Sequence, residues 1–181
     1  FAGRHEIEYA IPTDSGNGAV HTAVATINPS PGDEIITTPI SDVGTVLGII
    51  AQNAIPIFAD MDPDTFNISP EDIERKITDR TCAILIVHLF GNPCDMDEIM
   101  DISRRHGIPV IEDSSQAHLA EYKGKLVGTI GDIAAYSLGG KTLTTDQGGM
   151  VITNNRDLAA RSVGFTRKGS EMDDTLTEML G

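Results

Sequence analysis

Short apolar runs alternate with amphipathic or small-residue segments along most of the chain. Runs typical of buried strands lie at 9–12, 34–38, 54–59, 81–87, 108–112, 133–137 and 149–153. Helical patterns lie at 19–25, 43–51, 70–77, 96–106 and 157–165, and a glycine-turn hairpin is predicted at 121–128. Because strands and helices alternate, the pattern favours an α/β fold with a mainly parallel sheet flanked by helices.

Local signals mark where several of these helices begin. Ser69 and Pro70 place an N-cap residue before a proline at the first helical position. Asp42 can cap the apolar segment that follows it, and Asp95 is expected to cap the amphipathic helix 96–106. With no internal repeat and no low-complexity linker, the chain is expected to form a single compact unit.

Composition narrows the classes of partner. The 181 residues carry 13 Lys and Arg against 27 Asp and Glu, which gives a formal net charge of -14. Without a Lys/Arg cluster, nucleic acid and an anionic membrane are not expected as partners. No apolar run approaches the roughly 20 residues of a membrane span, and the N-terminus lacks a signal peptide's hydrophobic segment. A cytoplasmic protein is expected, with Cys82 and Cys94 reduced and no metal site.

An acid at the end of an apolar strand and a lysine in a later polar turn are the candidate chemical groups. Asp113 follows Val-Ile-Glu, and Lys141 is followed by Thr-Leu-Thr-Thr-Asp-Gln-Gly-Gly. Alone, the acid could cap a turn and the lysine could be a surface group. Together they are what pyridoxal phosphate requires, because a carboxylate keeps its pyridine nitrogen protonated and a lysine holds its aldehyde as an imine.

A loop of small polar residues precedes the first long helix. The stretch Asp14-Ser-Gly-Asn-Gly18 supplies capping groups and lets backbone N–H groups point outward. Such a loop is either a plain helix start or a phosphate site, because helix N-termini attract anions. Ligands of open α/β sheets bind at the carboxyl ends of strands, and the polar residues discussed here follow such ends.

Taken in order, these motifs resemble the DegT/DnrJ/EryC1/StrS sugar aminotransferases, which are fold type I pyridoxal phosphate enzymes. The resemblance covers nearly the whole chain. Its carriers are Ser15–Ala19, Pro31–Ile36, Phe58–Pro63, His88–Gly91, Glu112–His118 and Lys141–Gly149. Each motif is weak singly, but their order is specific.

The resemblance implies a role for each candidate residue. Asp113 would pair with the pyridine nitrogen, Gln116 would lie by the ring's hydroxyl side, and Lys141 would bind the coenzyme covalently. Gly16 and Asn17 would hold the phosphate through backbone N–H groups, joined by the hydroxyl of Ser137.

Two further residues are assigned to the substrate. Asp42 stands where the family usually has an aromatic residue that stacks on the coenzyme. His88 is either a satisfied histidine near the site or a substrate contact.

The implied reaction is the transfer of an amino group from glutamate or glutamine to a keto sugar, usually nucleotide-linked. The alternatives are a keto-sugar dehydratase or deoxygenating relative, which commonly has histidine in place of Lys141, and a non-catalytic protein that senses an amino sugar. Family members share their sites across a homodimer. By the same resemblance, residues 1–181 are expected to be a large coenzyme-binding domain that is incomplete at both ends, without the smaller C-terminal domain.

Overall fold

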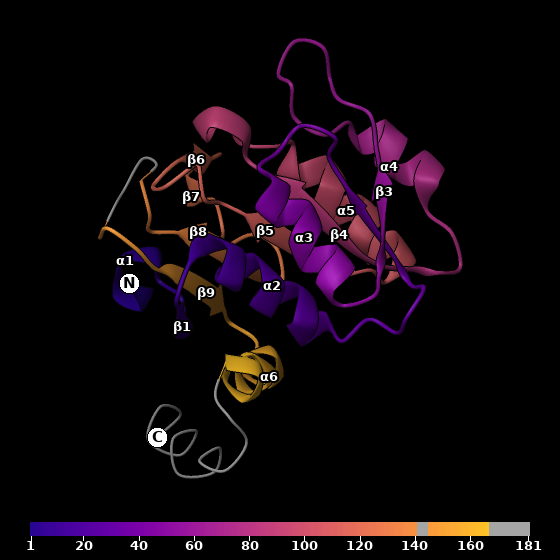
Figure 1. Cartoon of the computed structure of the whole chain (residues 1–181). Helices are drawn as coiled ribbons and strands as arrows, with labels where there is room; N and C mark the ends of the chain where they lie inside the picture. Colours follow the sequence, from indigo (N-terminus) through magenta and orange to yellow (C-terminus); the bar gives the residue numbers. More distant parts are fainter. Residues whose placement is uncertain (141–144, 167–181) are drawn as a thin grey trace.

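The computed structural model, shown in Figure 1, describes residues 1–140 and 145–166, and its main feature is a seven-stranded sheet. The strand order is β1-β9-β8-β5-β4-β2-β3. The strands are β1 (Tyr9–Thr13), β2 (Glu34–Thr37), β3 (Ile55–Phe58), β4 (Thr81–Val87), β5 (Val110–Asp113), β8 (Ile133–Ser137) and β9 (Gly149–Thr153). Strand β9 pairs antiparallel with β1 and β8, and every other pairing in the sheet is parallel. The predicted mainly parallel sheet is confirmed.

Helices cover both faces of this sheet. One face packs against α2 (Gly16–Ile27), α3 (Val43–Ala51) and α6 (Arg156–Thr166). The other packs against α1 (Ala2–His5), α4 (Pro70–Lys76) and α5 (Met96–His106). A short 3-10 turn, η1 (Leu89–Gly91), follows β4, and the small hairpin of β6 (Glu121–Tyr122) and β7 (Lys125–Leu126) follows β5. None of the described helices is long and apolar enough to cross a membrane.

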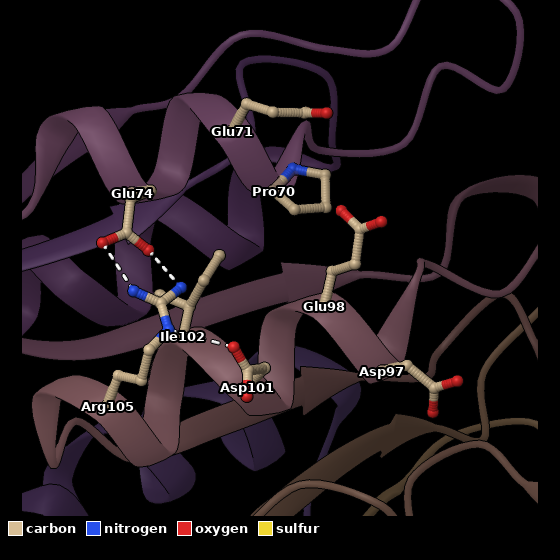
Figure 2. Close-up of a pocket in the computed structure, with 8 residues that line it drawn as sticks. All are labelled: Pro70, Glu71, Glu74, Asp97, Glu98, Asp101, Ile102 and Arg105. Atoms are coloured by element: carbon tan, nitrogen blue, oxygen red, sulfur yellow. Dashed lines mark hydrogen bonds and ion pairs between the residues drawn. The ribbon is translucent and has the colours of Figure 1, made fainter.

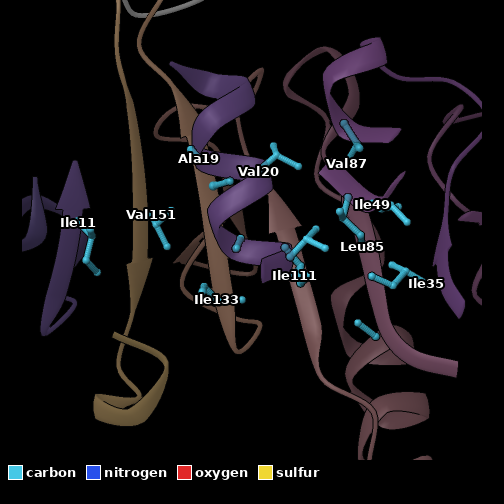
Figure 3. Packing of buried hydrophobic residues seen from close by; sticks show 14 of the residues in the cluster. Ile11, Ala19, Val20, Ile35, Ile49, Leu85, Val87, Ile111, Ile133 and Val151 are labelled. Carbon is cyan, nitrogen blue, oxygen red and sulfur yellow. The ribbon is translucent and has the colours of Figure 1, made fainter. Parts of the chain in front are cut away.

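The core forms because alternate strand residues point to opposite faces. Figure 3 shows Ala19 and Val20 of α2 lying over the side of the sheet that carries Ile111 and Ile133. The neighbouring positions Val110 and Glu112 point to the other face, where Val110 belongs to the cluster under α4 and α5. The same alternation decides which strand-end residues can meet.

The parallel strands bring distant residues to one edge of the sheet. Val87 at the end of β4 pairs with Asp113 at the end of β5, and Asp113 pairs in turn with Ala135 of β8. Ser137, which ends β8, lies opposite Gly149. Each predicted strand-end residue that the structure describes therefore lies along this carboxyl edge.

The predicted elements are present, with small shifts at their boundaries. Helix α2 begins at Gly16 and not at Ala19, because Ser15 caps it: its side chain accepts a hydrogen bond from the Gly18 N–H at 3.0 Å. Helix α1 was not predicted, since its four residues are too few to show a helical period and no side chain caps it.

Candidate functional site

Asp113 is a buried carboxylate at the carboxyl edge, with 4% of its surface exposed. Its Oδ2 accepts a hydrogen bond from the Thr45 hydroxyl at 2.9 Å. Its Oδ1 accepts one from the Ser115 backbone N–H at 3.1 Å. Each oxygen keeps a further lone pair, so the carboxylate is held in one orientation and can still accept a proton donor from a ligand.

The N-terminus of α2 lies beside Ser137 of β8. An ideal Cβ built on Gly16 would lie 2.5 Å from the Ser137 Cβ and 2.6 Å from its hydroxyl oxygen. Real Cβ atoms do not approach so closely, so glycine is required here. The N–H groups of Gly16 and Asn17 belong to the first helical turn, where helix geometry supplies no intrahelical acceptor. This corner therefore combines outward N–H donors with a hydroxyl, which suits a phosphate group.

A cavity of about 290 Å³ opens at this corner. Its lining joins the start of α2 to Asp42 and to the two ends of the segment between β8 and β9. The lining residues are Asp14, Ser15, Gly16, Asn17, Asp42, Ser137, Gly139, Asp146, Gln147 and Gly148. Three of them are carboxylates, and none of these lining residues is Lys or Arg. Within this lining, the N–H groups at the start of α2 and the Ser137 hydroxyl are the donors suited to an anion.

Gln116 is oriented by the turn after β4. Its Oε1 accepts the backbone N–H of Phe90 at 2.9 Å. Phe90 has φ 53 and ψ 25, in the left-handed region that bulky residues rarely adopt, and 83% of it is exposed. Because the oxygen is engaged by Phe90, the amide nitrogen of Gln116 is the end that can donate to a ligand.

His88 and Glu112 form a pair on the opposite face from Asp113, and both are fully buried. The Cys94 N–H donates to His88 Nδ1 at 3.0 Å, so the ring proton sits on Nε2, which donates to Glu112 at 2.9 Å. Glu112 also accepts backbone N–H groups from the loop before β8, those of Gly128, Ile130 and Gly131.

This arrangement sets the ionisation of Glu112. Burial opposes the charged form, but the hydrogen bonds from His88 and from the backbone outweigh it and hold the pKa of Glu112 below its ordinary value. For His88, full burial and two engaged ring nitrogens match the satisfied histidine of the two alternatives and leave no surface for a substrate contact. The pair joins the end of β4 to the loop that enters β8.

Of the two remaining predicted residues, Asp42 lies within the described part of the chain and Lys141 does not. Asp42 is the N-cap of α3, as predicted: its Oδ1 accepts the Gly44 N–H at 2.9 Å, and the residue is exposed at the rim of the cavity. Lys141 lies outside the described residues, so its role stays a prediction. The described residues on either side, Gly139 and Asp146, both line the cavity.

A more voluminous cavity, about 710 Å³, lies between α4 and α5 (Figure 2). There Arg105 donates to both carboxylate oxygens of Glu74, at 2.9 and 2.6 Å, and its Nε donates to Asp101 at 2.9 Å. Within the described part of the chain, no group of three or more His, Cys, Asp or Glu is placed to bind a metal ion. None of the predicted site residues that the structure describes lines this groove, and it is not the candidate site.

Comparison with known proteins agrees with this geometry. The model of the DegT/DnrJ/EryC1/StrS aminotransferase family matches residues 1–181. The chain belongs to this family. Family members use pyridoxal phosphate, and the predicted fold type I architecture is confirmed by the solved structures that the chain resembles.

Two curated relatives and one solved structure illustrate the similarity. GDP-perosamine synthase of Escherichia coli O157:H7 is 42% identical over 93% of this chain and 47% of that protein. L-glutamine:2-deoxy-scyllo-inosose aminotransferase of Streptomyces fradiae is 40% identical over 96% of this chain and 41% of that protein. NtdA of Bacillus subtilis, solved with the bound cofactor PMP, has a TM-score of 0.89 and 32% identity over 95% of this chain and 39% of that one. The chain thus spans less than half the length of these relatives.

The described residues fit the coenzyme. A rigid pyridine ring with a phosphate arm needs a carboxylate at the nitrogen and anion-binding N–H groups at the phosphate. Asp113 is the buried carboxylate, and the start of α2, with a glycine that a Cβ would obstruct, is the anion-binding corner. Sequence reasoning missed Thr45, the partner of Asp113; the available signal was a hydroxyl three residues after the Asp42 cap.

Proposed function

We propose that the protein is a pyridoxal phosphate-dependent aminotransferase that moves an amino group from glutamate or glutamine to a nucleotide-linked keto sugar. The observation that carries this proposal is the buried, doubly hydrogen-bonded carboxylate of Asp113 at the same sheet edge as the glycine corner of α2. The names of two relatives support a sugar as the substrate. One is a GDP-perosamine synthase, and the other is an aminotransferase for 2-deoxy-scyllo-inosose.

The residues divide the binding work between them. Asp113 would hold the pyridine nitrogen, Gly16 and Asn17 with Ser137 would hold the phosphate, and the Gln116 amide would donate to the ring hydroxyl. The bound coenzyme supplies an electron sink that stabilises negative charge on the substrate carbon. The protein's part is to fix that sink in place and to move protons.

Lys141 carries the proton transfers in this proposal. Its amine would hold the coenzyme in the resting enzyme, and once displaced by the amino donor it would act as general base and acid for the proton on the substrate carbon. The presence of a lysine distinguishes this chain from the deoxygenating relatives, which commonly have histidine at this place. Asp42, exposed at the cavity rim, is proposed to contact the substrate.

A homodimer in the cytoplasm is the proposed working form. Helix α3 supports it, because Val43, Leu47 and Ile50 are 66, 50 and 52% exposed on its outer face. No residue from Val43 to Ala51 is charged. A chain with net charge -14 repels a second copy, so two copies meet most readily through such an uncharged apolar face.

The function is tested by spectroscopy. Pyridoxal phosphate added to the protein should give the visible absorbance of lysine-bound coenzyme, and glutamate or glutamine should then convert it to the amine form. Product mass from a panel of nucleotide-linked keto sugars would identify the acceptor. A spectrum that stays unchanged on adding either amino acid would support the amino-sugar-sensing alternative and contradict the aminotransferase.

A further inference from the structure

Thr45 links helix α3 to the candidate coenzyme carboxylate. It is buried, with 1% of its surface exposed, and its hydroxyl donates to Asp113 Oδ2 at 2.9 Å. The same hydroxyl oxygen lies 2.6 Å from the Ser41 hydroxyl. Because the Thr45 proton goes to Asp113, Ser41 is the donor to Thr45. A directed chain therefore runs from Ser41 through Thr45 to the carboxylate.

Helix α3 also touches the phosphate corner. An ideal Cβ on Gly44 would lie 2.0 Å from the Asn17 side-chain oxygen. One turn later, a Cβ on Gly48 would lie 3.2 Å from a Val20 methyl and 3.3 Å from the His21 backbone. Two glycines on one side of α3 thus let it pack tightly against the first turns of α2, while Thr45 reaches Asp113.

These contacts matter because the coenzyme's ring is rigid and its phosphate arm is short. The separation of its ring nitrogen and its phosphate can vary only within a narrow range, so the protein must hold the carboxylate and the α2 N-terminus at a matching separation. Asp113 ends strand β5 of the sheet, whereas α2 belongs to the layer of helices that covers the sheet. Helix α3 is in contact with both: Thr45 hydrogen-bonds to Asp113, and Gly44 packs against Asn17 of α2.

We propose that Thr45 is a positioning residue for coenzyme binding: its hydroxyl fixes Asp113 in register with the phosphate-binding end of α2. The proposal rests on the function proposed above. It gives α3 the role of holding two groups of coenzyme-binding residues in place, although α3 does not itself bind the coenzyme. It concerns affinity for the coenzyme, a quantity that can be measured without turnover.

The test compares two substitutions at Thr45 with a matched control. Thr45→Val removes the hydroxyl and keeps the shape, and Thr45→Ser keeps the hydroxyl. Thr37→Val is the control, because Thr37 is equally buried and its hydroxyl has no hydrogen-bond partner. The dissociation constant of pyridoxal phosphate from the apoprotein should rise about tenfold in Thr45→Val, equal to about 1.4 kcal/mol. It should stay within about twofold of wild type in the other two variants, well below that tenfold step.

A double-mutant cycle shows whether Thr45 acts through Asp113. In an Asp113→Ala background, Thr45→Val should change the dissociation constant less than about twofold, because its partner is already gone. An equal loss in both backgrounds, or a Thr45→Val variant that melts earlier but binds coenzyme like Thr37→Val, would overturn the positioning role. If the wild-type protein binds no coenzyme, the proposed function itself fails, which is a different result.

Discussion

The Gly16 α-carbon faces Ser137 so closely that a methyl group would lie 2.5 Å from the serine Cβ and 2.9 Å from its Cα. One of these atoms belongs to the backbone of β8, so a rotamer change of Ser137 does not relieve the overlap. Helix α2 and strand β8 therefore meet at a point where only glycine fits. The close approach is what brings the N–H groups of the helix and the Ser137 hydroxyl to one anion-binding corner.

Gly16→Ala should weaken coenzyme binding by moving the first turn of α2 away from Ser137. Loss of one hydrogen bond to a charged group costs about 1.5–3 kcal/mol, which corresponds to about a ten- to hundredfold higher dissociation constant. Fluorescence titration of the apoprotein with pyridoxal phosphate measures it. Gly3→Ala is the control, since nothing lies within 4 Å of a Cβ there. Equal affinity of the two variants for pyridoxal phosphate would show that the corner between α2 and Ser137 does not bind the phosphate.

Gln116→Glu should weaken coenzyme binding more than Gln116→Ala does. The glutamate keeps an acceptor for the Phe90 N–H, which lies 2.9 Å from the glutamine oxygen, but loses the amide donor. Its second oxygen would then face the ring oxygen of the coenzyme, and two acceptors repel. Titration of both variants gives the order. A glutamate variant that binds as well as wild type would show that the amide does not meet the ring hydroxyl.

Glu112→Gln should lower the free energy of unfolding by about 2–3 kcal/mol at neutral pH. The reason is that an amide nitrogen, which is a donor, would face backbone N–H groups that donate to the carboxylate in the wild type. In the wild type, hydrogen bonds hold the pKa of Glu112 below its ordinary value of 4.5, against the opposing effect of burial. Its stabilising contribution is therefore present above that value and is lost as pH falls through the lowered pKa.

Urea unfolding at a series of pH values checks both parts of this prediction. The wild type should lose stability towards acid pH more steeply than the Glu112→Gln variant. Glu98→Gln, a change on the exposed side of α5, should follow the wild-type curve. Parallel curves for wild type and Glu112→Gln would contradict the account of the buried pair.

Leu47→Glu should shift the protein from dimer to monomer, because it places a charge in the middle of the apolar outer face of α3. Sedimentation velocity over a range of concentrations measures the change. Ile55→Glu on the edge strand β3 serves as control, since this residue is comparably exposed, at 42% against 50%, but lies outside that face. A Leu47→Glu protein that stays dimeric would place the interface elsewhere.

The sequence predicted the parts of the site that depend on neighbouring residues. The apolar strand that ends at Asp113 and the capped glycine loop before α2 were predicted from local sequence, whereas Ser137 was assigned through the family resemblance. The bond between Thr45 and Asp113 joins residues 68 positions apart, and no local pattern specifies such a pair. The hydrogen bond between His88 and Glu112 could not be predicted either, because it depends on both side chains lying on the same face of the assembled sheet.

The central claim is that Lys141 and Asp113 serve one coenzyme, and chemical trapping tests it most directly. The protein is loaded with pyridoxal phosphate, reduced with borohydride, digested and mapped by mass spectrometry. The account predicts a coenzyme adduct on Lys141, lost in Lys141→Ala together with the visible absorbance, and reduced in yield in Asp113→Ala at limiting coenzyme. An adduct on another lysine, or retained transamination by Lys141→Ala, would contradict it.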